Sequence, residues 1–188
     1  MSENIIKDLK SISEDFHDYL KGTTDAVSID SLPLSKDYLT ASQDSSYNIP
    51  VQKVADWFIC RSNSVEGDGI TNLKMQKLLY YAQGTSMEYT GRKLFDEGIE
   101  AWEHGTLIPS VYKRFKKYER NPITEKVSPP QLSSDVEAIL ESTFEEYGQY
   151  SAWKLVEMVH NEMPWRSTAR NCIIPDDKIY EQDRKSVV

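Results

Sequence analysis

The sequence has few of the residues from which metal sites, disulfide frameworks and nucleotide-binding loops are built. It contains two cysteines, Cys60 and Cys172, three histidines and eight glycines among 188 residues. It has no CxxC or HExxH spacing and no GxxxxGK[ST] or GxGxxG motif, so no zinc, Walker or dinucleotide-binding site is recognisable. We therefore expect no metal, no cofactor and no disulfide, and we expect each cysteine to be a small buried residue.

Long apolar runs and an excess of positive charge are also missing. No stretch approaches 18 consecutive apolar residues, so we expect no membrane span. Residues 1–4 lack the basic and apolar character of a signal peptide, and we expect a cytoplasmic protein. The chain carries 30 acidic and 22 basic side chains, a formal charge of −8. This acidity disfavours direct DNA binding.

The acid excess is concentrated in residues 1–49, which hold nine acidic and four basic residues. Residues 4–21 show one apolar stripe at helical spacing, and Gly22 is a natural stop. Residues 22–49 are rich in Ser, Thr and Asp and predict an extended arm. We divide the chain into this acidic region (1–49) and a domain (50–188). Whether helix and arm wrap the domain or bind a partner is left open.

From Val51 onward the spacing of apolar residues predicts a mainly α domain of the α+β class, with one small β element within residues 94–108. Residues 99–102 alternate in polarity as a short strand does. Among the inward-facing residues of the later helices we count Trp153. The helices are expected at residues 51–62, 73–88, 110–118, 132–147 and 151–161, with a helical turn at 164–165 and a last helix from 175 to 180.

Two histidines stand beside acidic residues, but no metal-ligand spacing accompanies them. His104 precedes Gly105, and we expect it to hydrogen-bond a turn. His160 is close to a helix end, where a partly protonated imidazole suits the helix dipole. A Cys/His nucleophile pair has no flanking motif to support it.

A basic face covers the helix that follows Pro109. Such a charge run is usually a solvated surface, and the functional alternative is a docking patch for an acidic partner. Aromatic residues at Tyr80, Tyr81, Trp102 and Trp165 are typical of cores and also of interfaces. Core packing is the favoured interpretation for these four. The basic face consists of Lys113, Arg114, Lys116, Lys117 and Arg120.

Four sequence blocks in order resemble the Panacea domain, the SocA-like, phage-associated antitoxin family. The first block is ITNLKMQKLLYYAQG (70–84), and the second is GRKLFDEGIEAWEHG (91–105). Residues 108–112 (IPSVY) match the family's P-x-V-Y, and residues 160–165 (HNEMPW) match its closing H-x-E-x-P-W. The usual Gly-Pro-Val after the second block reads Gly105-Thr106-Leu107 here, which changes the turn, because Thr106 restores an N–H and frees φ.

The resemblance implies an antitoxin that neutralises a toxin encoded nearby, often on a prophage, by direct protein–protein binding. It assigns no catalytic residues. Homo-oligomers and hetero-oligomers with the toxin are both left open. Residues implied as domain signature, in a scaffold or a shared pocket, are Leu73, Gln76, Lys77, Leu78, Tyr80, Tyr81, Trp102, His104, Gly105, Pro109, His160, Pro164 and Trp165.

We expect the acidic region to contribute to toxin recognition, because a toxin that handles nucleotides or RNA, such as a small alarmone synthetase, presents a cationic site. The alternatives are a proteolytic adaptor that delivers the toxin to a protease, and an enzyme using His104 and His160. Candidate toxin-binding residues are Ile5, Leu9, Ile12, Phe16, Tyr19, Leu20, Tyr38 and Tyr47.

Overall fold

The computed structural model describes residues 46–63 and 69–185, with side chains up to Gln182. The helix expected at 4–21 and most of the arm, residues 22–45, lie outside the described residues. The described part is mainly helical with one two-stranded antiparallel sheet. The predicted fold class, mainly α within α+β, is confirmed.

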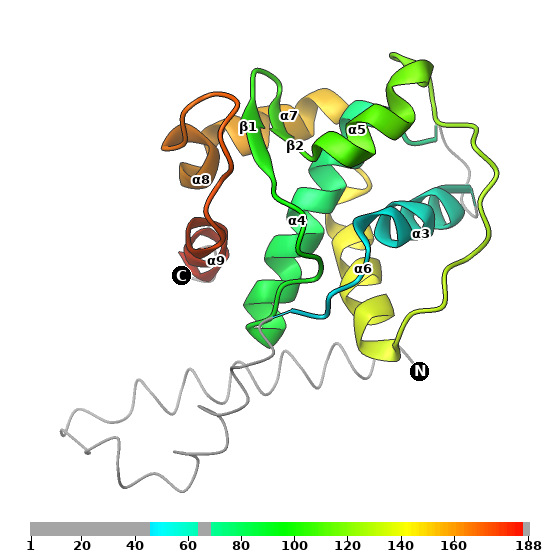
Figure 1. Cartoon of the computed structure of the whole chain (residues 1–188), viewed down its shortest axis with the longest axis horizontal. Coiled ribbons are helices and arrows are strands. Elements are labelled where there is room, and N and C mark those ends of the chain that lie inside the picture. Colours follow the sequence, from blue (N-terminus) through cyan, green and yellow to red (C-terminus); the bar gives the residue numbers. More distant parts are fainter. Residues whose placement is uncertain (1–45, 64–68, 186–188) are drawn as a thin grey trace, which may run out of the picture. The chain divides into compact units, whose positions relative to one another are not determined.

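Helix α4 (Asn72–Thr90) is the centre of this domain (Figure 1). Thr71 caps its start by accepting a hydrogen bond from the Lys74 amide, and Gly91 ends it in the left-handed conformation (φ 67°). Both ends follow ordinary capping chemistry, and the helix agrees with the one expected at residues 73–88. Every side chain from Met75 to Met87 is buried. The helix is therefore packed on all sides and lies at the centre of the hydrophobic core.

The other elements surround α4. Helix α3 (Val51–Asn63), expected at residues 51–62, buries one face made of Val51, Val54, Ala55, Phe58 and Ile59. Helices α6 (Ser134–Tyr147), α7 (Ala152–Asn161) and α9 (Asp176–Lys185) contact α4 along its length. The short helix α8 (Met163–Arg166) follows α7, as Pro164 and Trp165 predict.

The β element is a hairpin of β1 (Glu100–Trp102) and β2 (Gly105–Leu107), paired Glu100 with Leu107, Ala101 with Thr106 and Trp102 with Gly105. Residues 171–174 run along the other edge of β1, where the Ala101 amide donates to the Cys172 carbonyl. Helix α5 (Pro109–Phe115) follows β2 directly and ends in the 3-10 turn η3 (Lys116–Tyr118). Pro109 occupies the first turn of α5, as predicted.

Three local expectations are wrong. Trp153 stands in the first turn of α7 and is 63% exposed, whereas Leu155, Val156 and Val159 face inward. Helical spacing explains this, because a residue two positions before Leu155 points to another face. Cys172 is exposed at the edge of β1, and Cys60 is only half-buried.

The chain enters the domain beside the end of α4. Ser46 forms an isolated parallel β-bridge with Lys93. The Tyr47 and Ile49 amides donate to the Lys93 and Leu94 carbonyls at 2.7 and 3.1 Å. Of the helices described, none is long and apolar enough to cross a membrane.

Candidate functional site on helix α4 and the hairpin

Polar side chains of α4 hold the backbone of the segments packed against it. Gln76 is 2% exposed, and its Oε1 accepts from the Ile108 amide at 2.8 Å. Its Nε2 donates to Asn72 Oδ1 at 2.9 Å, and the Asn72 amide group donates to the Tyr112 carbonyl at 3.2 Å. This chain of bonds attaches Ile108, between β2 and α5, and the Tyr112 carbonyl, within α5, to α4.

Gln83 repeats the arrangement two turns further along α4. Its Oε1 accepts from the amides of Leu94 and Phe95 at 2.9 and 3.2 Å, and its Nε2 donates to the Phe95 carbonyl at 3.0 Å. Gln83 is 1% exposed, and its bonds to these backbone groups lie inside the domain, away from water. One buried amide therefore satisfies three buried backbone groups, which would otherwise each cost about 1–3 kcal/mol.

Lys77 is the buried cation of the site. Its side chain is 1% exposed, and its Nζ donates to the Thr106 carbonyl at 2.6 Å. Burial away from water lowers the pKa of Lys77 to about 7. Gly105 lies directly over it with φ +94°, and a Cβ there would approach Lys77 Cε to 2.8 Å. The hairpin turn thus needs glycine both for its conformation and for the lysine beneath it.

Thr106 stands where the family pattern has proline. Its carbonyl binds Lys77, a contact that proline also offers, since proline lacks only the N–H. Its hydroxyl is buried and has no hydrogen-bond partner among the described residues. Among the described residues, His160 Nε2 is the other buried side-chain atom without one. The departure from the pattern therefore keeps the contact that α4 uses.

Tyr80 and Tyr81 converge on one carboxylate. Their hydroxyls donate to Glu162 Oε2 and Oε1 at 2.7 and 2.8 Å. Burial raises the pKa of Glu162, and the two hydroxyl donors partly oppose this by favouring the charged form. The Tyr81 ring also stacks on Tyr147 with centroids 3.9 Å apart. The loop between α7 and α8 is thereby held against α4.

His160 and Trp165 join α7 and α8 to the hairpin. Their rings stack at 4.0 Å, and Trp165 Nε1 donates to the Trp102 carbonyl at 2.9 Å. Burial lowers the pKa of His160, and the nearby charge of Lys77 adds to this. The expectation of a partly protonated imidazole is therefore wrong in direction, because desolvation outweighs the helix-end position.

His104 lies at the exposed hairpin turn. Its ring meets Trp153 edge to face at 5.5 Å, so it contacts α7 through an aromatic pair. The remaining predicted signature residues are spread over the domain: Leu78 is fully buried, Leu73 is half-buried, Pro164 is buried in α8, and Pro109 is exposed. The structure thus gathers Lys77, Gly105, His160, Trp102 and Trp165 around the hairpin and leaves these others apart.

Most predicted toxin-binding residues, Ile5, Leu9, Ile12, Phe16, Tyr19, Leu20 and Tyr38, lie outside the described residues. Tyr47 is described and half-buried, and the Arg92 guanidinium lies 4.0 Å from its ring centroid. Tyr47 also lines a shallow cavity of about 250 Å³ between the start of α3 and the start of α6.

The basic face on α5 and η3 has two parts. Arg114 Nη2 lies 2.6 Å from Asp56 and 2.7 Å from Glu125, and Lys117 lies 3.5 Å from Glu125. These contacts connect α5 to α3 and to the segment before α6. The other members, Lys113, Lys116 and Arg120, are exposed and form no ion pair with any described residue.

Sequence reasoning gave no structural contact to four residues of this site: Asn72, Gln83, Thr106 and Glu162. A usable signal was present for Gln83, because it lies in a helix whose apolar residues cover most of its circumference, and a buried amide must find partners. Glu162 had the weaker signal of an acid between a helix and Pro164. No local sequence pattern identifies a backbone carbonyl, such as that of Thr106, as the partner of a lysine far away in the sequence.

The buried side chains of this arrangement hold the domain together, and its exposed side chains are available to a partner. The titratable groups of buried Lys77 and half-buried Glu162 already have partners. Within residues 46–63 and 69–185, no three His, Cys, Asp or Glu side chains gather closely enough to hold a metal ion. The groups left open to a partner lie outside, at the hairpin turn and on α5.

Comparisons with known proteins show which family these residues are similar to. Residues 75–166 match the model of the antitoxin SocA-like, Panacea domain. The chain is 36% identical to the antitoxin SocA of Caulobacter vibrioides over 110 residues, which cover 51% of this chain and 58% of that protein. The chain thus spans less than two thirds of that relative's length. No solved structure matches the chain.

Proposed function

The chain carries a SocA-like Panacea domain at residues 75–166, and we propose from this that it is the antitoxin of a toxin–antitoxin pair. It neutralises a toxin encoded nearby by direct protein–protein binding in the cytoplasm. The observation that carries the proposal is that the matched segment runs from Met75 in α4 through the hairpin to the end of α8. The similarity therefore covers the contacts that hold this domain together.

The side chains of the site favour binding over catalysis. Lys77 and Glu162 are the buried groups with shifted pKa values that catalysis would use, and both are taken up by contacts within the fold. His104 and His160 are each engaged with a tryptophan ring. We therefore assign no catalytic residue to the protein.

We further propose that the acidic region, residues 1–49, contributes to toxin recognition. Its nine acidic residues against four basic ones support this, because a toxin that handles nucleotides or RNA has a cationic site to cover. A small alarmone synthetase is one such toxin. The candidate contacts are Ile5, Leu9, Ile12, Phe16, Tyr19, Leu20, Tyr38 and Tyr47.

A growth rescue tests the main proposal. The adjacent open reading frame is induced alone and together with this protein, in a normal host and in a protease-deficient host. We expect the neighbour to arrest growth, and we expect rescue in both hosts with a stable complex on copurification. Rescue confined to the normal host would favour the proteolytic adaptor instead.

The role of the acidic region is tested separately by a chain lacking residues 1–48. We expect it to accumulate normally but to rescue growth less well. Full rescue by this truncation would remove the acidic region from toxin recognition. The enzyme alternative gains support only if His104→Ala or His160→Ala abolishes rescue while the melting temperature stays unchanged.

A further inference from the structure

An exposed aromatic surface lies next to the hairpin. Trp102 is 37% exposed, and its ring centroid lies 6.3 Å from that of Tyr112 on α5. Trp102 Nε1 donates to Glu100 Oε2 at 2.7 Å, so the polar edge of the indole is already bonded. What the tryptophan offers to solvent is an apolar ring surface, the kind of group that anchors protein interfaces.

Cations that form no ion pair with a described residue follow Tyr112 along α5 and η3. Residues 109–121 contain five cations and one carboxylate in a chain whose formal charge is −8. Arg114 and Lys117 are paired with Asp56 and Glu125, which leaves three exposed cations free of ion pairs with described residues. Lys116 follows Tyr112 by one helical turn and so shares its side of the helix. We call Trp102, Tyr112, Lys113, Lys116 and Arg120 the Trp102–α5 face.

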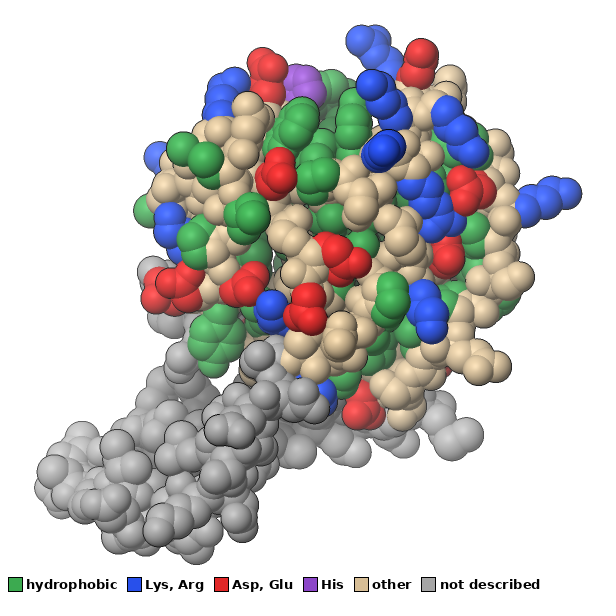
Figure 2. Space-filling view, viewed as in Figure 1, with side chains coloured by type: hydrophobic (Ala, Val, Ile, Leu, Met, Phe, Trp, Pro, Cys, Tyr) green, Lys and Arg blue, Asp and Glu red, His purple; other side chains and the backbone are tan. Residues whose placement is uncertain are grey.

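The space-filling view shows the same arrangement. Hydrophobic side chains gather at the top of the domain beside the hairpin, and Lys and Arg side chains lie over α5 next to them (Figure 2). A surface of this kind is complementary to a segment that carries carboxylates around an apolar residue. Nucleic acid, the other polyanion, is repelled by the net charge of the chain.

We propose that the Trp102–α5 face binds an acidic segment of the toxin. An apolar side chain of that segment packs on Trp102 and Tyr112, and its carboxylates pair with Lys113, Lys116 and Arg120. This proposal rests on the proposed function. It adds a second, basic contact with the toxin to the acidic contact proposed for residues 1–49. Two contacts of opposite sign give a partner one preferred orientation, because a reversed partner places like charges together.

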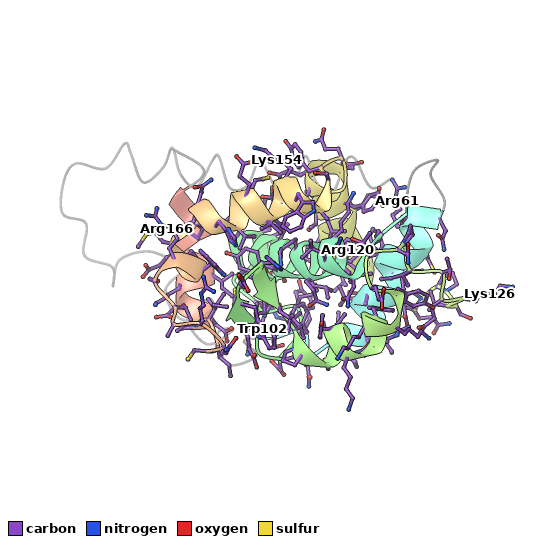
Figure 3. All side chains as sticks on the ribbon, turned by 90° about the horizontal axis from the view of Figure 1, so that it is seen from above. Arg61, Trp102, Arg120, Lys126, Lys154 and Arg166 are labelled. Atoms are coloured by element: carbon purple, nitrogen blue, oxygen red, sulfur yellow. The ribbon has the colours of Figure 1, made fainter. Side chains whose placement is uncertain are left out.

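The test is a charge reversal in the full-length protein, Lys113→Glu/Lys116→Glu. The matched control is Lys53→Glu/Lys126→Glu, which changes the net charge equally through two exposed lysines elsewhere. Lys126 lies at the opposite end of the domain from Trp102 (Figure 3). Affinity for the purified product of the adjacent toxin gene is measured by calorimetry at two salt concentrations, together with each melting temperature.

We expect the Lys113→Glu/Lys116→Glu variant to lose at least about tenfold in affinity, and the control to lose no more than about twofold. Raising the salt concentration weakens the wild-type complex more than the variant complex, since the variant has lost the screened attractions. Both melting temperatures stay within about 2 °C of the wild type, because the four lysines are exposed.

Two results overturn the proposal while leaving the proposed function intact. One is an equal loss in both double variants, which means that net charge and not this face attracts the toxin. The other is unchanged toxin affinity with loss of binding to a labelled 20-nucleotide single-stranded RNA, which reassigns the face to nucleic acid. If the wild type neither binds the neighbour's product nor rescues growth, the proposed function fails and this proposal with it.

Discussion

The buried polar side of α4 and the exposed Trp102–α5 face use similar residue types for opposite purposes. On α4, Gln83 and Lys77 are inside the domain, and each donates to a backbone carbonyl. On α5, Lys113 and Lys116 are exposed and unpaired with described residues. Burial therefore separates the polar residues that hold the fold together from the exposed residues that we propose to contact a partner.

The two regions also differ in what a substitution should do. A buried donor or acceptor that loses its partner costs about 1–3 kcal/mol, whereas surface changes usually stay within about 0.5 kcal/mol. Changes on the α4 side should therefore lower the free energy of unfolding. Changes on the Trp102–α5 face should lower affinity for the toxin alone.

The largest effect is expected for Gln83→Leu. The substitution keeps an apolar side chain in the core but leaves the Leu94 and Phe95 amides and the Phe95 carbonyl without their partner. We expect a loss of about 3 kcal/mol or more in the free energy of unfolding, measured by urea denaturation. Gln149→Leu, at an exposed glutamine, is the control and should change stability by less than about 0.5 kcal/mol.

The next largest effect on stability is expected for Gly105→Ala. It forces a side chain into φ +94° and toward Lys77 Cε, and we expect a loss of about 2–3 kcal/mol by the same denaturation assay. Gly91→Ala provides the comparison, because Gly91 also has a positive φ (+67°) but no atom within 4 Å of an added Cβ. A loss at Gly105 no greater than that at Gly91 would show that the lysine beneath the turn does not matter.

Lys77→Met should alter how stability depends on pH. The folded-state pKa of Lys77 is lowered from 10.5 to about 7, so between these values the unfolded chain binds more protons. Stability of the wild type should therefore rise as the pH increases from 7 toward 10, by at most about 1.4 kcal/mol per pH unit, relative to Lys77→Met. Parallel curves for the two proteins, measured by urea denaturation, would contradict a buried lysine with a lowered pKa.

The smallest effect on stability is expected at the exposed face. Lys113→Glu/Lys116→Glu should change the free energy of unfolding by less than about 0.5 kcal/mol, since no described residue pairs with either lysine. The same urea titration checks this. A loss of 2 kcal/mol or more would place these lysines with the α4 side chains as part of the scaffold.

The sequence predicted the helices well because their apolar spacing is strong and their ends carry caps. Thr71, Gly91 and Pro109 begin or end helices where their chemistry indicates. The hairpin was placed within residues 94–108, although only its first strand showed alternation. Trp153 was misplaced, although its spacing of two positions before Leu155 puts it on a different face from Leu155, Val156 and Val159.

The candidate site was only partly accessible from the sequence. The resemblance supplied Lys77, Tyr80 and Tyr81, but their partners are a carbonyl and a carboxylate 29 to 82 residues away. Such pairings depend on how the elements pack, and the local spacing of apolar residues does not predict them. The lowered pKa of His160 was missed for the same reason, because desolvation comes from residues distant in sequence.

Growth rescue with matched protein levels is the most direct test of the division between scaffold and binding surface. The wild type and Lys113→Glu/Lys116→Glu are each expressed with the adjacent toxin gene, and antitoxin abundance is measured by immunoblot. We expect rescue by the wild type and markedly weaker rescue by the variant at equal abundance. No rescue by the wild type, or full rescue by the variant at that abundance, would contradict neutralisation through this face.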